Sequence, residues 1–195
     1  SLDFYHKNSF IEELKLLLKK FPDHNELATI EKIKDKSKVL YIGIDLKRFD
    51  TYKIKNEGPP LILWNHRWEY DKNPETFFKV LFNLHKTGID FRVAVLGEKY
   101  KKYPSIKINN INEMEAIYCN TYPLLPNRLS YPELLPIDYH NEHIYINNDD
   151  LINKLKSTIM NIKKIRNLKF NKIAQPYDWS TMKKSYDQLL CSFIK

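Results

Sequence analysis

Two cations in a short polar segment are the side chains best suited to bind a charged ligand. Arg67 and Lys72 lie between an apolar run, residues 61–64, and the sequence Asn73-Pro74-Glu75. Arg can hold two phosphate oxygens as a fork, and Lys supplies a point charge. A helix beginning at the Asn-Pro-Glu sequence would add its positive N-terminal end. The segment could therefore form an anion site, but the residues of a single segment of this kind favour a solvated charged turn.

Further candidate residues follow other predicted strands or begin a helix. Glu115 falls in the first turn of a predicted helix, where a carboxylate would accept hydrogen bonds from a ribose diol or complement the helix dipole. Glu98 follows a predicted strand and would contact a base or cap a loop. The segment 126–133 would form a pocket wall or a structural turn. The other polar candidates for ligand binding are Asn65, His66, Arg128 and Ser130.

Several familiar chemistries have no motif in the sequence. The chain has only four glycines and neither G-x-G-x-x-G nor G-x-x-x-x-G-K-[ST], so a phosphate site must be built from side chains and a helix N-terminus. His140 and His143 are three residues apart without a metal-ligand pattern, and we expect no metal. Cys119 and Cys191 stand in apolar patterns, and we expect two buried free thiols.

The central part of the chain alternates strand and helix patterns. An apolar run at 61–64 predicts a buried strand, Asn73 caps a helix over 74–87 with Pro74 at its first position, and 91–96 is the next strand. A strand–helix–strand unit of this kind builds a parallel, doubly wound sheet. Because ligands bind beyond the carboxyl ends of such strands, the segment 65–72 lies where a ligand would bind.

The flanking segments predict further elements. Helices are expected at 10–21, 25–34 and 113–119, and strands at 39–44, 122–125 and 144–146. A helix capped by Asn148 and a C-terminal helix complete the list. The polar stretch 45–60 ends in Gly58-Pro59-Pro60, which predicts a boundary between units 1–58 and 59–195.

One part of this pattern is too short. Only about 16 residues separate the strand at 91–96 from the helix at 113–119, where a parallel crossover needs a dozen or more residues with a helix of its own. We therefore expect that residues are missing near 105–111, or that a deletion is real.

Composition indicates which partners the chain would bind and where in the cell it would be located. The formal net charge is +8 and the pI is about 9.2, which favours anionic partners or reflects a lysine-rich coding bias, since the lysines are spread along the chain. There is no apolar run of 18 residues, so no membrane span is expected. The first residues lack a signal-peptide layout and an initiating Met. We expect a piece of a cytoplasmic protein.

Several segments resemble one family. The runs Pro60–Glu75, Glu115–Cys119 and Leu125–Glu133 are similar to tRNA-queuosine α-mannosyltransferases. The opening Tyr5–Phe10 and the run Gly43–Leu46 resemble the interdomain region of that family. The resemblance implies the C-terminal, donor-binding half of a two-domain (GT-B) retaining glycosyltransferase with a Rossmann-like α/β fold, preceded by a remnant of the other domain.

The resemblance also implies a reaction and roles for residues. Mannose would pass from GDP-mannose to queuosine in tRNA with retained configuration and without a metal. Arg67 and Lys72 fall on the diphosphate-binding Arg and Lys of the wider family, and Glu115 on the last Glu of its E-x7-E motif. Lys107 stands where the family has the first Glu, and Asn110 where it has Gly. Alternatives are another nucleotide sugar and acceptor, or a non-catalytic basic nucleotide- or RNA-binding module.

Overall fold

Short parallel strands and the helices around them form the body of the protein. The computed structural model describes residues 3–23, 26–52, 57–66, 72–96 and 112–194. Strand β1 (Leu61–Trp64) leads through helix α3 (Pro74–Lys86) to β2 (Arg92–Val95), and the two strands pair in parallel from Leu61 opposite Arg92 to Trp64 opposite Val95. The predicted strand–helix–strand unit is therefore confirmed, but the expected burial of its first strand was wrong, because only Trp64 of β1 is buried.

A second parallel pair lies further along the chain. Strand β3 (Leu125–Pro126) pairs with β4 (Ile144–Tyr145). Between them lie the 3-10 turns η3 (Tyr131–Leu134) and η4 (Ile137–Tyr139) and the short helix α5 (His140–His143). The described strands thus form two two-stranded parallel sheets. The coarse prediction, an α/β protein with parallel strands, is confirmed.

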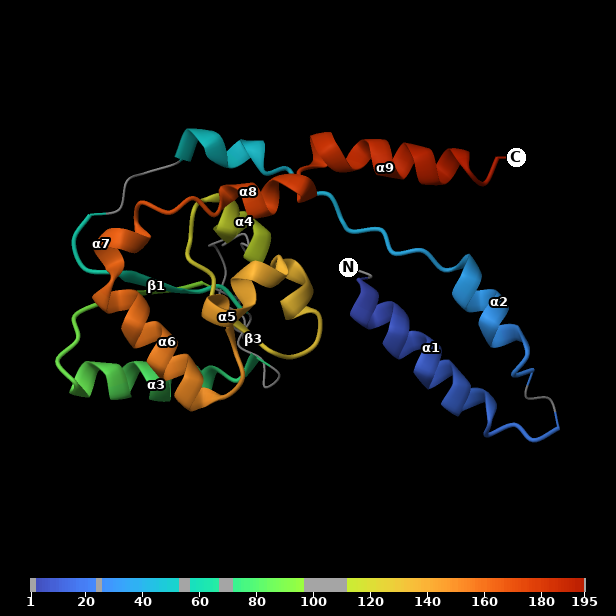
Figure 1. Ribbon diagram of the computed structural model, residues 1–195, viewed down its shortest axis with the longest axis horizontal. Coiled ribbons are helices and arrows are strands. Elements are labelled where there is room, and N and C mark those ends of the chain that lie inside the picture. The colour runs from blue at the N-terminus through green and yellow to red at the C-terminus, as the bar shows by residue number, and fades with distance from the viewer. Residues whose placement is uncertain (1–2, 24–25, 53–56, 67–71, 97–111, 195) are drawn as a thin grey trace, which may run out of the picture.

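Helices lie on two sides of these strands (Figure 1). Helix α3 packs with α6 (Asn148–Met160), and α4 (Glu113–Tyr118) packs with α8 (Asn171–Ala174). Between α6 and α8 the chain forms α7 (Ile162–Ile165). After α8, the turn η5 (Gln175–Tyr177) leads to the C-terminal helix α9 (Trp179–Cys191).

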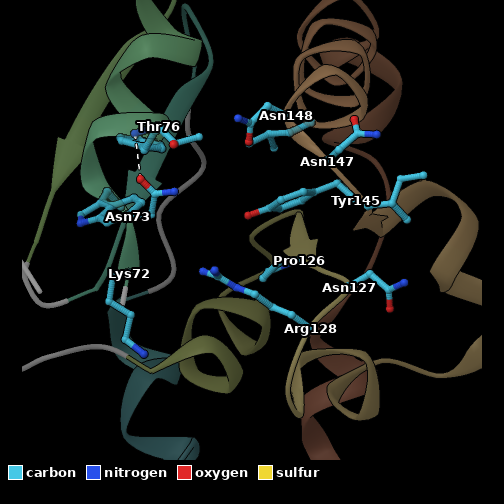
Figure 2. Close-up of a pocket in the computed structure, with 13 residues that line it drawn as sticks. Lys72, Asn73, Thr76, Pro126, Asn127, Arg128, Tyr145, Asn147 and Asn148 are labelled. Atoms are coloured by element: carbon cyan, nitrogen blue, oxygen red, sulfur yellow. Dashed lines mark hydrogen bonds between the residues drawn. The ribbon is translucent and has the colours of Figure 1, made fainter. Parts of the chain in front are cut away.

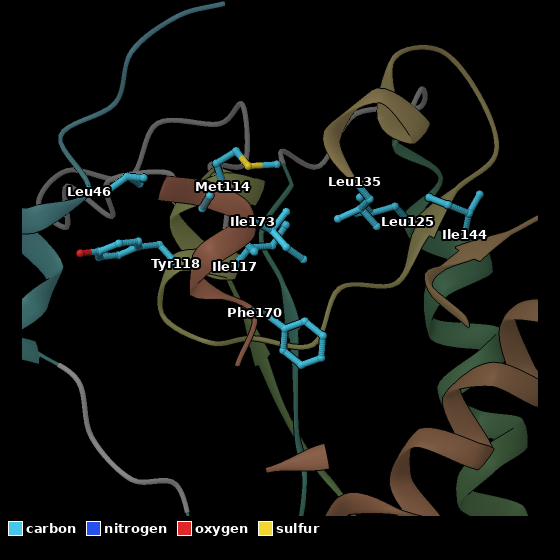
Figure 3. Close-up of a cluster of buried hydrophobic side chains, with 10 residues drawn as sticks. Leu46, Met114, Ile117, Tyr118, Leu125, Leu135, Ile144, Phe170 and Ile173 are labelled. Atoms are coloured by element: carbon cyan, nitrogen blue, oxygen red, sulfur yellow. The ribbon is translucent and has the colours of Figure 1, made fainter. Parts of the chain in front are cut away.

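Each helix pair has its own apolar core. The first core surrounds α4 and α8, with Ile117 2% exposed and Phe170 3% exposed, and includes residues of both strands of the second sheet (Figure 3). The second core joins α3 to α6 through Leu84 and Ile159 and also contacts Ile62 of β1. Burial of apolar surface stabilises a fold by roughly 25 cal/mol per Å². The packing of strand and helix residues into these two cores therefore holds the strands in place against the helices.

Helix starts follow local capping rules. Asn73 accepts a hydrogen bond from Thr76 N at 3.3 Å and caps α3, as predicted. Asn147, not the predicted Asn148, caps α6 by accepting from Asp150 N at 2.9 Å. The prediction was one residue late because two neighbouring asparagines both suit the cap position.

The N-terminal segment lies beside the body and not within it (Figure 1). Helix α1 (Phe4–Leu18) has no buried residue, and α2 (Thr29–Lys36) has one, Ile30. Helix α1 begins earlier than predicted because Asp3 caps it, accepting from His6 N at 2.9 Å. Glu133 on η3 also accepts hydrogen bonds from the first amides of α1, Phe4 N at 3.0 Å and Tyr5 N at 2.7 Å.

Two predictions about the flanking segments were wrong. Residues 39–44 form no extended strand, because in this described segment Leu40 and Ile44 are single bridge residues, and Ile44 bridges Asp178 by exchanging hydrogen bonds with the backbone at 177 and 179. Cys119 and Cys191 are exposed and not buried, although neither forms a disulfide. Cys191 was misassigned because the apolar pattern of α9 does not pack into a core: no residue of that helix is buried.

Residues 45–52 pack on the body within the stretch predicted to be a boundary. The 3-10 helix η1 (Lys47–Tyr52) follows Leu46, which is completely buried in the first core. Asp50 accepts a hydrogen bond from the Tyr118 hydroxyl of α4 at 2.9 Å. No helix among the described residues is long and apolar enough to cross a membrane.

Candidate functional site

A pocket of about 240 Å³ opens where the carboxyl ends of the parallel strands meet two helix starts (Figure 2). Its walls come from the ends of β1, β3 and β4 and from the first turns of α3 and α6. This is where a parallel sheet places its ligand sites, because the strand ends there and the following helix presents unpaired amides. The pocket is smaller than the ~300–1,000 Å³ of typical drug-sized sites, and suits a small polar group.

One wall belongs to the unit β1–α3. Trp64 ends β1, and Lys72 and Asn73 lead into α3, whose first turn contributes Thr76. Asn73 adopts a left-handed conformation with φ of 52°, which brings its side chain over the first turn of the helix. In Figure 2 the Lys72 side chain lies below Asn73 on this wall. The wall thus combines one cation with a helix N-terminus.

The opposite wall comes from the second sheet and α6. Pro126 ends β3, Tyr145 ends β4, and Asn147 and Asn148 begin α6. Arg128 follows β3, and its guanidinium extends toward the α3 wall in Figure 2. Asn127 N donates to Tyr145 O at 2.8 Å, which holds the segment carrying the arginine against β4.

Among the described residues, the charged side chains that line this pocket are both cations. Lys72 and Arg128 approach it from opposite walls, and α3 and α6, each of 13 residues, direct their positive ends toward it. Carboxylates in the first turns reduce this field in part. Asp150 accepts hydrogen bonds from Ile146 N at 3.0 Å and from Lys154 Nζ at 3.1 Å, which lower its pKa and keep it ionised, and the Lys154 cation offsets its charge. The arrangement suits an anion such as a phosphate group.

Trp64 adds a polar atom without a partner. Its side chain is 7% exposed, and its indole Nε1 has no hydrogen-bond partner among the described residues. The ring packs on Phe77 at 4.5 Å and on His66 at 5.2 Å between centroids. A buried donor of this kind costs roughly 1–3 kcal/mol when unpaired, so an acceptor at this wall of the pocket would be stabilising.

Two of the predicted site residues line the pocket together. Lys72 and Arg128 are 56 residues apart in the chain and face the same space. Arg67 and Glu98 lie outside the described residues, so their positions stay predictions.

His66 and Asn65 follow β1 but do not line the pocket. The His66 Nδ1 atom lies 3.6 Å from Glu113 Oε1, and its ring is 6.3 Å from that of Tyr131. These contacts place His66 between the start of α4 and the segment after β3, next to the pocket.

Glu115 is held by two interactions within the protein. Its Oε2 accepts from Asn112 N at 2.8 Å while Asn112 Oδ1 accepts from Glu115 N, which is a capping box at the start of α4. Its Oε1 lies 2.5 Å from Arg48 Nη2. Glu115 is 4% exposed and does not line the pocket. Its position therefore serves the helix start, and contact with a ribose would require Arg48 to move.

Ser130 faces the N-terminal helix instead of the pocket. Its side chain forms a hydrogen bond with Asp3, one of several that lower the pKa of Asp3 against the effect of burial. Ser130 thus joins the segment 126–133 to the start of α1.

The two histidines of interest have structural contacts. His140 Nε2 lies 3.0 Å from the carbonyl oxygens of Pro132 and Leu135, and His143 Nδ1 lies 2.8 Å from that of Pro123. Within the described part of the chain, no three His, Cys, Asp or Glu side chains group as metal ligands.

Sequence reasoning missed the contribution of α6 and β4. Tyr145, Asn147 and Asn148 line the pocket, and burial raises the pKa of Tyr145 while nearby Arg128 lowers it. The signal was present, since a predicted strand at 144–146 runs directly into a helix. Applying the strand-end rule to it would have identified these residues.

The fold and the pocket define a class. The chain is an α/β protein with parallel strands, and the pocket at its strand ends, lined by Lys72 and Arg128 beside two helix N-termini, suits an anionic ligand.

Comparisons with known proteins narrow this class. A family model described as tRNA-queuosine alpha-mannosyltransferase N-terminal matches residues 3–44. A tRNA-queuosine alpha-mannosyltransferase of Drosophila melanogaster is 27% identical over 200 aligned positions, which cover 77% of this chain and 52% of that protein. The resemblance to tRNA-queuosine α-mannosyltransferases noted in the sequence is thus confirmed.

The chain spans about half the length of this relative. Because the 200 aligned positions exceed the 195 residues of the chain, the relative has positions in the aligned region where this chain has no residue. No solved structure matches.

Proposed function

We propose that this chain is the donor-binding half of a retaining GT-B glycosyltransferase that transfers mannose from GDP-mannose to queuosine in tRNA. The observation that carries the proposal is the pocket at the strand ends, with Lys72 and Arg128 on opposite walls and two helix N-termini directed toward it. The similarity to a tRNA-queuosine alpha-mannosyltransferase supplies the sugar, the nucleoside and the tRNA.

The pocket would bind the diphosphate of the nucleotide sugar. As the bond between sugar and phosphate breaks, negative charge accumulates on the leaving GDP, and fixed cations and amides lower the energy of that state. Lys72 and Arg128 lie where they would do so, and Arg67 joins them in the sequence-based hypothesis. The charge is neutralised by side chains and helix ends, so the proposed reaction needs no metal.

The domain arrangement belongs to the same proposal. Residues 59–195 would form the Rossmann-like donor domain, and 1–58 would belong to the connection with the acceptor domain. The match of residues 3–44 to an N-terminal family model supports this division. The short, irregular stretch before the helix at 113 is the ground for proposing a missing segment near 105–111, which lies outside the described residues. The proposed location is the cytoplasm.

Thermal stability in the presence of nucleotides tests the donor site. A ligand at 100 times its Kd stabilises a protein by about 2.7 kcal/mol, which raises Tm by several degrees. We expect GDP-mannose and GDP to raise Tm, and UDP-sugars to do so less. Lys72→Ala, Arg128→Ala and Arg67→Ala should each remove most of the effect. Lys79→Ala is a matched control, because Lys79 is exposed on α3, lies 4.0 Å from Glu75 and does not line the pocket. The absence of any nucleotide effect on Tm would contradict the proposal.

A second candidate is a nucleotide- or RNA-binding module without catalysis. The observation in its favour is Glu115, whose two carboxylate oxygens are engaged by Asn112 and Arg48. Mass spectrometry of queuosine nucleosides after incubation with GDP-mannose and tRNA distinguishes the two. GDP protection without sugar transfer would favour the binding module.

A further inference from the structure

Almost all of the net charge of the chain lies in one stretch. Residues 151–177 contain seven Lys or Arg and no Asp or Glu, which gives +7 of the formal +8. The remaining residues hold 25 basic and 24 acidic side chains, from totals of 32 and 24. The lysines are spread along the chain, as noted above, but the acids that balance them elsewhere are absent here.

Most of these cations are exposed. Lys156, Lys163, Lys164, Lys169 and Lys172 lie at the surface along a run from the end of α6 through α7 to α8. In Figure 1 this run follows the outside of the body from α6 past α7 to α8. Each of these lysines lacks a salt bridge to any carboxylate of the described residues, whereas Lys79 and Lys34 on other helices lie 4.0 and 3.8 Å from a glutamate.

The other two cations of the stretch hold it in place. Lys154 Nζ donates to Ile144 O at 2.7 Å and Asp150 at 3.1 Å, and Arg166 Nη2 donates to Gly58 O at 2.6 Å. Arg166 thereby fixes the segment after α7 to the turn that precedes β1. The backbone that carries the five exposed lysines is therefore held before Lys156 and again between Lys164 and Lys169.

The apolar residues of the stretch face inward. Leu155, Ile159, Phe170 and Ile173 are buried in the two cores. The exposed large hydrophobic residues of the stretch are Met160 and Leu168, and none is aromatic. Segments that bind membrane surfaces combine their cations with apolar side chains, often aromatic, that enter the lipid. This surface offers charge without such side chains, which favours a hydrated polyanion.

We propose that the cationic surface formed by Lys156, Lys163, Lys164, Lys169 and Lys172 binds the phosphate backbone of RNA. Lysines spaced along a fixed run neutralise successive phosphates, and the release of counterions makes such binding favourable and salt-dependent. Contacts of this kind position an RNA without reading its sequence. The choice of RNA as the polyanion rests on the proposed function. The excess of positive charge in residues 151–177 is independent of that function.

Binding of a fluorescent transfer RNA transcript by the 195-residue chain tests this proposal. The variant carries Lys163→Gln, Lys164→Gln, Lys169→Gln and Lys172→Gln. The control carries Lys15→Gln, Lys19→Gln, Lys20→Gln and Lys32→Gln, which removes the same charge from α1, the two residues that follow it and α2, a region that also contains acidic residues such as Glu12, Glu13 and Glu31. Fluorescence anisotropy is recorded from about 50 to 300 mM salt, the range in which counterion effects are large.

We expect the variant to bind RNA at least about tenfold more weakly than the wild type, with a salt slope smaller by about 2–3. The control should stay within about threefold, and both should keep the wild-type Tm. Equal losses of RNA affinity in the variant and the control would mean that only total charge matters, which would overturn the proposal. Unchanged RNA affinity in both proteins, or a wild type that does not bind RNA, would overturn it as well. So would a variant that loses binding to anionic phospholipid vesicles but not to RNA.

The same variant separates this proposal from the donor site. Stabilisation by GDP should be unchanged in it, because none of its four lysines lines the pocket. If the variant loses RNA binding and nucleotides do not change the Tm of the wild type, the RNA-binding proposal stands and only the donor site is contradicted.

Discussion

At the scale of single residues, the pair Arg48–Glu115 has the clearest measurable effect. Glu115 is almost completely buried, whereas the Arg48 side chain is 50% exposed. We expect Arg48→Ala to lower the free energy of unfolding by about 1–2 kcal/mol, less than the 3–5 kcal/mol of a fully buried pair because solvent screens the arginine. Adding Glu115→Gln should recover part of this loss. Urea unfolding of the double-mutant cycle measures both, and strictly additive losses would show that the two side chains do not interact.

His143 predicts a pH dependence of stability. It is 3% exposed, and burial lowers its pKa, with a smaller lowering by Lys154 and opposing effects of the Pro123 carbonyl and Glu142. The unfolded chain therefore binds more protons than the folded one just below pH 6.5, so stability is complete above this value and declines as the pH falls below it.

Urea midpoints measured between about pH 5 and pH 7.5, on either side of the unperturbed histidine pKa, test this effect. His143→Phe removes the titrating group and should flatten the profile, although it loses the contact with Pro123 O. His85→Gln, at an exposed position near the end of α3, should leave the profile as it is. A profile of the same slope in His143→Phe would contradict the assignment.

At the scale of elements, Asp178 joins the N-terminal segment to α9. One carboxylate oxygen accepts from Ser180 N at 2.9 Å and caps α9, and the other accepts from Leu46 N at 3.2 Å. We expect Asp178→Ala to destabilise the protein by about 2–3 kcal/mol, because a helix cap and a buried amide lose their acceptor together. Asp187→Ala, on the exposed part of α9, should change stability by less than about 0.5 kcal/mol. Differential scanning calorimetry compares the two.

The elements also show what sequence can predict. The unit β1–α3–β2 was predicted because its signals are local: an apolar run, an Asn-Pro cap and a helical repeat ended by Gly88. The strand at 39–44 was wrong because a strand needs a neighbour along its length, and Ile44 bridges a residue more than 130 positions away. For the same reason Lys72 and Arg128 were found singly, while their position across one pocket depended on how β3 and β4 lie beside α3.

At the scale of the whole molecule, α1 exposes an apolar surface. Phe10 is 55% exposed and Leu17 51%, and Phe21 just after the helix is 56% exposed. Exposed apolar patches of this kind tend to bind other surfaces. We expect the 195-residue chain to self-associate as its concentration rises, and Phe10→Glu with Leu17→Glu to reduce this. Sedimentation velocity measures the change, and identical profiles for the two proteins would contradict it.

The segment 126–133 contacts two distant parts of the molecule. At one end Arg128 faces the pocket. At the other end Glu133 accepts hydrogen bonds from the first amides of α1, and Ser130 forms a hydrogen bond with Asp3. A rotation of α1 would therefore pull on the backbone that carries the pocket arginine. The position of the N-terminal helices and the affinity of the pocket would then depend on each other. Glu133→Gln should change the affinity for GDP, although Glu133 does not line the pocket. A partner that binds α1 and shifts it would then change the affinity of the pocket for its ligand.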